Sequence, residues 1–140
     1  MIHYIERAAE NFSLHQLESS FEKLEMTPKV RTFIAYIDVI DTKESSHRVY
    51  LACEASLMQQ ISELFLGEVV SDEATLIDFS LELANMVIGS AKVLAEEENT
   101  HPFTIGTPIF EKFDHFDFPI DAQSALSINK HTAIIAIKEL

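Results

Sequence analysis

The amino-acid sequence predicts an α+β fold built around an antiparallel β-sheet. The first observation is the order of the periodic segments, which runs helix, two strands, two helices and three strands. The second is that short polar turns connect strands that follow each other along the chain. A short turn reverses the chain, so such strands pair antiparallel, and helices and strands in separate runs indicate an α+β class.

The N-terminal segment is predicted to be helical. Residues 5–24 carry apolar side chains at helical spacing, and Thr27-Pro28 would end the helix because a proline disfavours helical backbone in the residue before it. Ser13 and Gln16 have the spacing of a capping box, so a second helix could begin within this segment. We therefore expect residues 1–28 to form a leading helical segment.

A hairpin and a short helix are expected next. Residues 31–40 alternate in a way that predicts a strand with both faces partly buried. A polar turn over residues 41–46 leads to a returning strand over residues 48–54. Residues 56–66 fit a short helix, and Gly67 stands where a left-handed residue commonly ends one.

The longest periodic segment covers residues 72–98 and predicts a long helix. Ser71 or Asp72 can cap its start, and the acidic residues of its first turn suit the positive end of the helix dipole. Three short strand-like runs follow, the last two separated by a hairpin turn at Asn129-Lys130-His131: residues 103–113, 122–128 and 132–137.

Length and charge narrow the possible classes of function. The chain has 140 residues, which fits one domain over residues 1–140. Ten Lys and Arg against 23 Asp and Glu give a net charge of −13, which repels both nucleic-acid phosphates and anionic lipid. We therefore expect neither a nucleic acid nor a membrane as partner.

The cysteine content and the hydrophobic runs favour a cytoplasmic protein. Cys53 is the single cysteine of the sequence, so an intramolecular disulfide is impossible and a reducing compartment is the simplest setting. The sequence contains no run of about 18 apolar residues, so it predicts no membrane-spanning segment. The first residues do not have the pattern of a signal peptide.

A polar stripe interrupts the apolar character of the long helix. Asp78, Glu82, Asn85 and Gly89 stand at i, i+4, i+7 and i+11, which places them on one helix face. A glycine within a helix costs about 1 kcal/mol relative to alanine, which suggests that something approaches closely on this face. The alternative is that Glu82 and Asn85 are merely the solvated side of the helix.

The stripe resembles the signature helix of the CheC/CheX/FliY family of chemotaxis phosphatases. The family pattern is Asp or Ser, three residues, Glu, two residues, Asn, 22 residues and Pro. Asp78, Glu82 and Asn85 fit its first part, residues 86–107 supply the spacing, and Pro108 follows.

Within that family the chain is most similar to CheX. CheC and FliY carry two Glu-x-x-Asn helices, whereas residues 56–66 contain no Glu followed three positions later by Asn. The resemblance implies one CheX-like phosphatase domain over residues 1–140, with long helices packed on one face of an antiparallel sheet. It also implies a homodimer paired through sheet edges, in which the apolar run Thr132–Ile137 would find a covering surface.

The activity that the resemblance implies is hydrolysis of the phosphoaspartate of a response regulator, CheY. Asn85 would orient the attacking water, and Glu82 would pair with the regulator's active-site Lys. Asp78, Gly89 and Pro108 would have supporting or partner-contacting roles. No cofactor of the chain's own is expected, because the regulator supplies Mg²⁺.

Two other classes of function stay open. One is a non-catalytic domain that docks on a response regulator, as the motor-switch relative FliM illustrates for this fold. The other is an unrelated acidic dimerisation domain with a coincidental motif. A metal site at Asp114, His115 and Asp117 is disfavoured because no clustered His or Cys supports it. This segment is better explained as an acidic loop with aromatic anchors.

Overall fold

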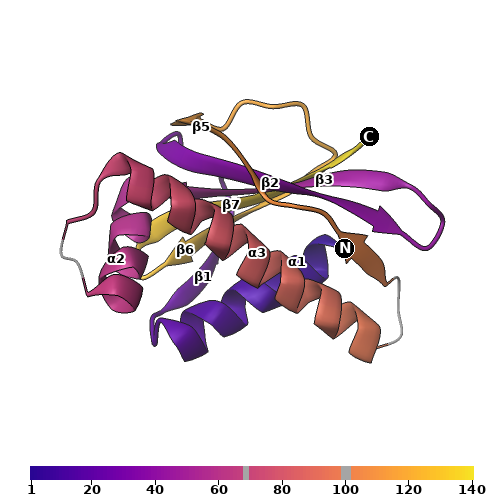
Figure 1. Ribbon diagram of the computed structural model, residues 1–140, viewed down its shortest axis with the longest axis horizontal. Helices are drawn as coiled ribbons and strands as arrows, with labels where there is room; N and C mark the ends of the chain where they lie inside the picture. Colours follow the sequence, from indigo (N-terminus) through magenta and orange to yellow (C-terminus); the bar gives the residue numbers. More distant parts are fainter. Residues whose placement is uncertain (68–69, 99–101) are drawn as a thin grey trace.

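All the strands of the computed structural model, which describes residues 1–67, 70–98 and 102–140, belong to one antiparallel sheet (Figure 1). Within these residues the strand order is β1-β6-β7-β3-β2-β4, and β5 pairs with the same side of β2 as β4. The strands are β1 (Phe21–Leu24), β2 (Arg31–Asp41), β3 (Ser46–Glu54), β4 (Phe103–Ile105), β5 (Ile109–His115), β6 (Ala122–Ile128) and β7 (His131–Glu139).

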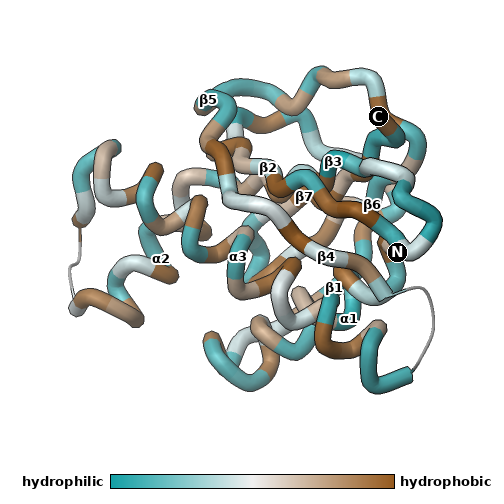
Figure 2. Tube along the Cα trace, turned by 45° about the vertical axis from the view of Figure 1, so that its right-hand side comes forward, coloured by the Kyte–Doolittle hydropathy of each residue, from teal (hydrophilic) through white to brown (hydrophobic). Residues whose placement is uncertain are grey.

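The helices lie on one face of this sheet, as Figure 1 shows for α1 and α3. They are α1 (Ile2–Asn11), the π-helical turn η1 (Phe12–Gln16), α2 (Ala55–Leu66) and α3 (Glu73–Glu97). In Figure 2, α1 and α3 alternate between hydrophobic and hydrophilic stretches along their length, as expected for helices with one buried side. The predicted α+β class is confirmed.

Strand β2 is buried on both sides, as its alternating pattern predicts. Phe33 and Ile37 pack into the core beneath the helices, whereas Ile34 packs on the opposite face. That second face is covered by the connection from β5 to β6, through Phe116 and Phe118. The chain therefore buries both faces of its central strands with its own residues.

The predicted helix over residues 5–24 is wrong in its second half. The helix proper ends at Asn11, a π-type turn follows in which the Leu17 N–H donates to the Phe12 carbonyl (3.1 Å), and residues 21–24 form β1. Ser13 caps no second helix, and its hydroxyl donates to the Ser20 carbonyl (3.2 Å). Pairing with β6 outweighs a local apolar spacing that suits a helix equally well.

The predicted strand over residues 103–113 is divided into β4 and β5. Val39 pairs with Ile105 and Tyr36 pairs with Ile109, so an advance of three residues along β2 corresponds to four residues from β4 to β5. The segment between β4 and β5 therefore contains one extra residue, which forms a bulge beside β2. At Gly106 the backbone N–H donates to the Asp38 carbonyl at 2.9 Å, and a Cβ here would lie 3.1 Å from the same oxygen.

The C-terminal strand is not an exposed edge, which corrects one ground for the expected dimer. β7 lies between β6 and β3, and residues 132–137 are buried within the chain itself. The apolar run therefore needs no second subunit to cover it. Among the described residues, the outer strands of the sheet are β1 on one side and β4 with β5 on the other.

Candidate functional site

Helix α3 begins at a side-chain cap and buries one face against the sheet. The Asp72 carboxylate accepts a hydrogen bond from the Thr75 N–H at 2.9 Å, so of the two expected caps Asp72 is the one used. Hydrogen bonds from Thr75 hold the pKa of Asp72 below its ordinary value of 3.8. The buried face includes Leu76, Leu83 and Val87, and this fixes which side of α3 is turned to solvent.

The predicted polar stripe lies on the solvent side of α3. Asp78, Glu82 and Asn85 are exposed, and Gly89 is half-buried. Side chains three or four residues apart on a helix have Cβ atoms about 5–6 Å apart, so Glu82 and Asn85 are neighbours. Within the residues that the structure describes, none of the three polar side chains makes a hydrogen bond or an ion pair. They are therefore available to a partner.

The packing of the described residues does not require a glycine at position 89. A Cβ built at Gly89 would meet the Ile105 side chain at 4.0 Å, which is ordinary van der Waals contact. The close approach that a glycine in the helix suggests is thus not made by any described residue. The described residues thus leave room for a side chain at this position.

Pro108 lies apart from the exposed stripe. It is half-buried in the bulge between β4 and β5, where a residue without a backbone N–H is tolerated. The contact of Ile105 with the position of Gly89 shows that β4 runs beside the second half of α3. Pro108 thus lies at the edge of the sheet next to α3 and is not part of the exposed surface of α3.

The disfavoured metal site gains no support. The described part of the chain contains no group of three or more His, Cys, Asp or Glu side chains arranged to hold a metal ion. The carboxylate of Asp114 accepts a hydrogen bond from the His115 N–H at 2.7 Å, which lowers its pKa. The expected aromatic anchors are confirmed, because Phe113 packs on Phe33 and the two phenylalanines that follow it pack on Tyr50. The expected loop is wrong in its first part, because residues 113–115 pair with β2 as the end of β5.

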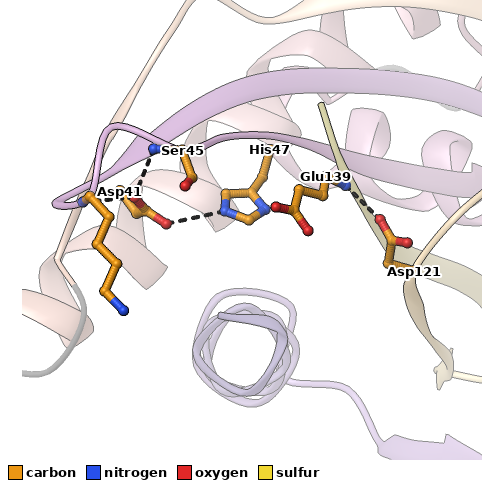
Figure 3. Close-up of polar contacts among 6 residues, drawn as sticks. Asp41, Ser45, His47, Asp121 and Glu139 are labelled. Carbon is orange, nitrogen blue, oxygen red and sulfur yellow. Dashed lines mark hydrogen bonds and ion pairs between the residues drawn. The ribbon is translucent and has the colours of Figure 1, made fainter.

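A second polar cluster lies at the turn between β2 and β3 (Figure 3). The Asp41 carboxylate accepts a hydrogen bond from the Ser45 N–H at 3.0 Å and lies 3.2 Å from Nε2 of His47. The Ser45 hydrogen bond is the main cause that lowers the pKa of Asp41. His47 faces Glu139 across the sheet, and the Glu139 N–H donates to Asp121 at 2.6 Å. These contacts close a turn and join strand ends, which is a structural role.

The thiol of Cys53 and the hydroxyl of Ser80 are buried. Burial raises the pKa of Cys53 to about 12, so its thiol stays protonated and unreactive at neutral pH. Ser80 is buried and donates to the Ile77 carbonyl at 2.7 Å. Neither side chain is available to attack a substrate.

Sequence reasoning missed a groove beside the stripe. It has a volume of about 480 Å³ and lies between α1 with η1 on one side and α3 on the other. Its α3 wall includes Met86 and Ser90, the residues next to Asn85 and Gly89. The helical spacing of the α3 residues in this wall could be predicted from the sequence. The facing wall depends on the π-type turn, for which the sequence has no recognisable pattern.

The fold is shared with several chemotaxis proteins of known structure. The CheX protein of Vibrio vulnificus matches with a TM-score of 0.83 at 16% identity, covering 99% of this chain and 95% of that one. A CheC-like protein of Shewanella oneidensis matches with a TM-score of 0.75 at 19% identity, covering 100% and 97%. The CheX–CheY–BeF3–Mg²⁺ complex of Borrelia burgdorferi matches with a TM-score of 0.67 at 11% identity, covering 99% and 96%.

The sequence itself also carries the family signal. No curated protein matches the chain. In the described residues, no helix has both the length and the apolar character needed to cross a membrane. The family model of the chemotaxis phosphatase CheX matches residues 33–128, a span that includes the polar stripe and Pro108. Because this span is more than half of the chain, the chain belongs to the CheX family of chemotaxis phosphatases.

Proposed function

We propose that this protein hydrolyses the phosphoaspartate of a CheY-like response regulator. The observation that carries the proposal is the pair Glu82 and Asn85 on α3, exposed and without hydrogen-bond or ion-pair partners among the described residues, in a chain of the chemotaxis phosphatase family. A CheX protein with the same fold has been captured with CheY, BeF3 and Mg²⁺, and this supports the choice of partner.

Asn85 is the residue that orients the attacking water. An aspartyl phosphate is already activated, so the main task left is to place water in line with the phosphorus. A carboxamide can accept from and donate to one water molecule, and it adds no charge beside the phosphoryl oxygens. The exposed place of Asn85 on a capped, well-packed helix suits such a task, because positioning depends on a rigid support.

Glu82 anchors the helix over the regulator's active site. Its carboxylate has no cation partner within the described residues, and we propose that the regulator's active-site Lys supplies one. Charge complementarity of this kind sets the register of the two surfaces and speeds their encounter. The net charge of −13 favours the same partner, a regulator with a basic surface.

The other motif residues support this arrangement. We propose that Asp78 contacts the regulator at the N-terminal end of the stripe and that Gly89 lets the regulator approach the helix closely. Pro108 keeps the strand edge beside α3 in shape. Mg²⁺ belongs to the regulator in this proposal, and the CheX–CheY–BeF3–Mg²⁺ complex supports this assignment. A cytoplasmic setting is part of the same proposal, because its substrate is an intracellular signalling protein.

The test is a comparison of response regulators as substrates. Candidate regulators are phosphorylated with a small-molecule phosphodonor, freed of the donor, and mixed with catalytic amounts of the protein. Loss of the phosphoryl group is followed against spontaneous hydrolysis. We expect faster loss for at least one CheY-like regulator. If the protein binds a regulator without changing the lifetime of its phosphoaspartate, the non-catalytic adaptor is the correct function.

A further inference from the structure

The groove beside the polar stripe has one wall that repeats the spacing of the stripe. Met86, Ser90, Val93 and Glu97 stand at i, i+4, i+7 and i+11 on α3, the spacing that also joins Asp78 to Gly89. They therefore form a second row on the helix, turned toward α1. Figure 1 shows α1 and α3 side by side in front of the sheet. The groove between them lies next to the stripe, because Met86 and Ser90 of its wall directly follow Asn85 and Gly89.

The opposite wall presents polar side chains to the groove. Asn11, His15 and Gln16 line it, and the widened π-type turn brings Gln16 to the same side as Asn11. The floor is apolar, with Ala8, Phe12 and Val87. Among the described residues, no hydrogen bond or ion pair involves the side chains of Asn11, His15, Gln16 or Ser90. The groove thus offers an apolar base and a rim of unused hydrogen-bonding groups.

The position of the groove places it within reach of whatever docks on the stripe. Val93 follows Asn85 by eight residues, which is about 12 Å along a helix. A standard protein interface covers about 800 Å² on each partner, a patch roughly 30 Å across. A partner centred on Glu82 and Asn85 therefore extends over the groove.

The charges of the groove and of the whole chain favour a basic partner over a second copy of this chain. Among the described residues that line the groove, Glu97 alone carries a formal charge, and it is acidic. A second copy of this chain would bring two surfaces of a protein with a net charge of −13 together. A partner with a basic residue beside an apolar side chain suits both the rim and the base.

We propose that this groove is a second docking subsite for the response regulator, filled by an apolar side chain that has a basic neighbour on the regulator's surface. The inference rests on the proposed function, because the same regulator must occupy the stripe. The groove contributes affinity and leaves the chemistry to Asn85. Loss of this subsite should therefore raise the dissociation constant of the regulator and KM.

The experiment compares two lysine substitutions at matched sites. Val93 is 49% exposed and lines the groove, whereas Leu14 is 46% exposed on η1 and does not line it. Val93→Lys and Leu14→Lys add the same charge and each replaces an aliphatic side chain, and both sites are open enough for the variants to fold. Val93→Met, which keeps an apolar side chain, is the conservative control. Each variant is titrated against a regulator activated with beryllofluoride and Mg²⁺.

We expect Val93→Lys to raise the dissociation constant about tenfold, which corresponds to about 1.4 kcal/mol. Leu14→Lys and Val93→Met should change it less than about twofold. The proposal is overturned if Val93→Lys binds like the wild type, if Leu14→Lys weakens binding equally, or if the wild type binds no activated regulator.

Binding and hydrolysis measurements together distinguish failure of this proposal from failure of the proposed function. A wild-type protein that binds the activated regulator but does not hydrolyse its phosphoaspartate fails as a phosphatase, while the dissociation constants still decide the role of the groove. Conversely, hydrolysis with an unaltered Val93→Lys dissociation constant leaves the phosphatase intact and removes the second subsite.

Discussion

Glu82 and Asn85 are both exposed and form no hydrogen bond or ion pair with the described residues, but they differ in what they can do to a bound regulator. A carboxylate recognises a cation, whereas a carboxamide can hold water without adding charge. The two residues should therefore fail in different ways when they are replaced. Because both side chains are exposed, their replacement tests function with little effect on folding.

Replacement of Glu82 should weaken binding of the regulator as well as turnover. Loss of one partner of a desolvated charge pair costs about 2–5 kcal/mol, so Glu82→Ala should raise the dissociation constant strongly. Glu82→Lys should be worse than Glu82→Ala, because two ammonium groups would then face each other. Titration of each variant with the activated regulator at two salt concentrations measures the two dissociation constants. Equal affinities for Glu82→Lys and the wild type would exclude the proposed contact with Lys.

Gly89 and Gly106 should respond in opposite directions to replacement by alanine. At Gly89 the added Cβ meets only a side-chain carbon at 4.0 Å, so Gly89→Ala should raise the free energy of unfolding by about 0.5–1 kcal/mol. At Gly106 the Cβ would lie 3.1 Å from the Asp38 carbonyl oxygen, so Gly106→Ala should lower it.

Urea denaturation measures both glycine variants, and titration of the regulator adds a functional reading. If the regulator approaches α3 closely, Gly89→Ala should bind it less tightly despite its greater stability. A Gly89→Ala protein that is less stable than the wild type would contradict the packing described for α3.

At the scale of the elements, the sequence predicts best where backbone conformation depends on a few local residues. Gly67 ends α2 in the left-handed region, and Asn129 and Lys130 have the positive φ values of the predicted hairpin turn. Strands β1 and β4 were not predicted as separate strands, since each is defined by pairing with a distant segment. Local spacing in a four-residue strand cannot report that pairing.

The cap of α3 should make the stability of the site helix depend on pH. The pKa of Asp72 is lowered in the folded state, so its contribution is full above the ordinary value of 3.8 and is lost as the pH falls through the folded-state pKa. Asp72→Ala should lower the urea midpoint at pH 7, and Asp72→Asn should lower it less, because an amide oxygen still accepts from Thr75.

Denaturation of the wild type and Asp72→Asn over a pH series checks this prediction. The difference between them should shrink as the pH falls below 3.8 and through the lower folded-state pKa, where the wild-type carboxyl becomes protonated in the folded protein. A difference that stays constant to acid pH would show that the charge of Asp72 does not stabilise the helix.

At the scale of the whole molecule, the polar stripe was predictable and the groove was not. The stripe depends on one helix and its period, whereas the groove needs the relative placement of α1, η1 and α3. The family was also readable from one helix and Pro108, and the match to residues 33–128 confirms it. The roles of Asp78, Glu82, Asn85, Gly89 and Pro108 stay predictions.

The homodimer also stays a prediction, now on different grounds. β7 is interior, so the surfaces left for pairing among the described strands are the outer sides of β1 and of β4 with β5. An outer strand carries unpaired backbone groups that a second copy can satisfy. Light scattering should return about twice the 15.8 kDa of one chain, and a particle of 15.8 kDa at micromolar concentration would contradict the dimer.

The most direct test of the central claim is the rate of phosphoaspartate hydrolysis by Asn85→Ala, measured with a saturating regulator. If Asn85 orients the attacking water, the rate should fall on the order of 10²-fold or more, while the dissociation constant of the activated regulator stays close to that of the wild type. Unfolding by urea should be unchanged within about 0.5 kcal/mol, because Asn85 is exposed. A folded Asn85→Ala protein that dephosphorylates its regulator at the wild-type rate would contradict the proposed mechanism.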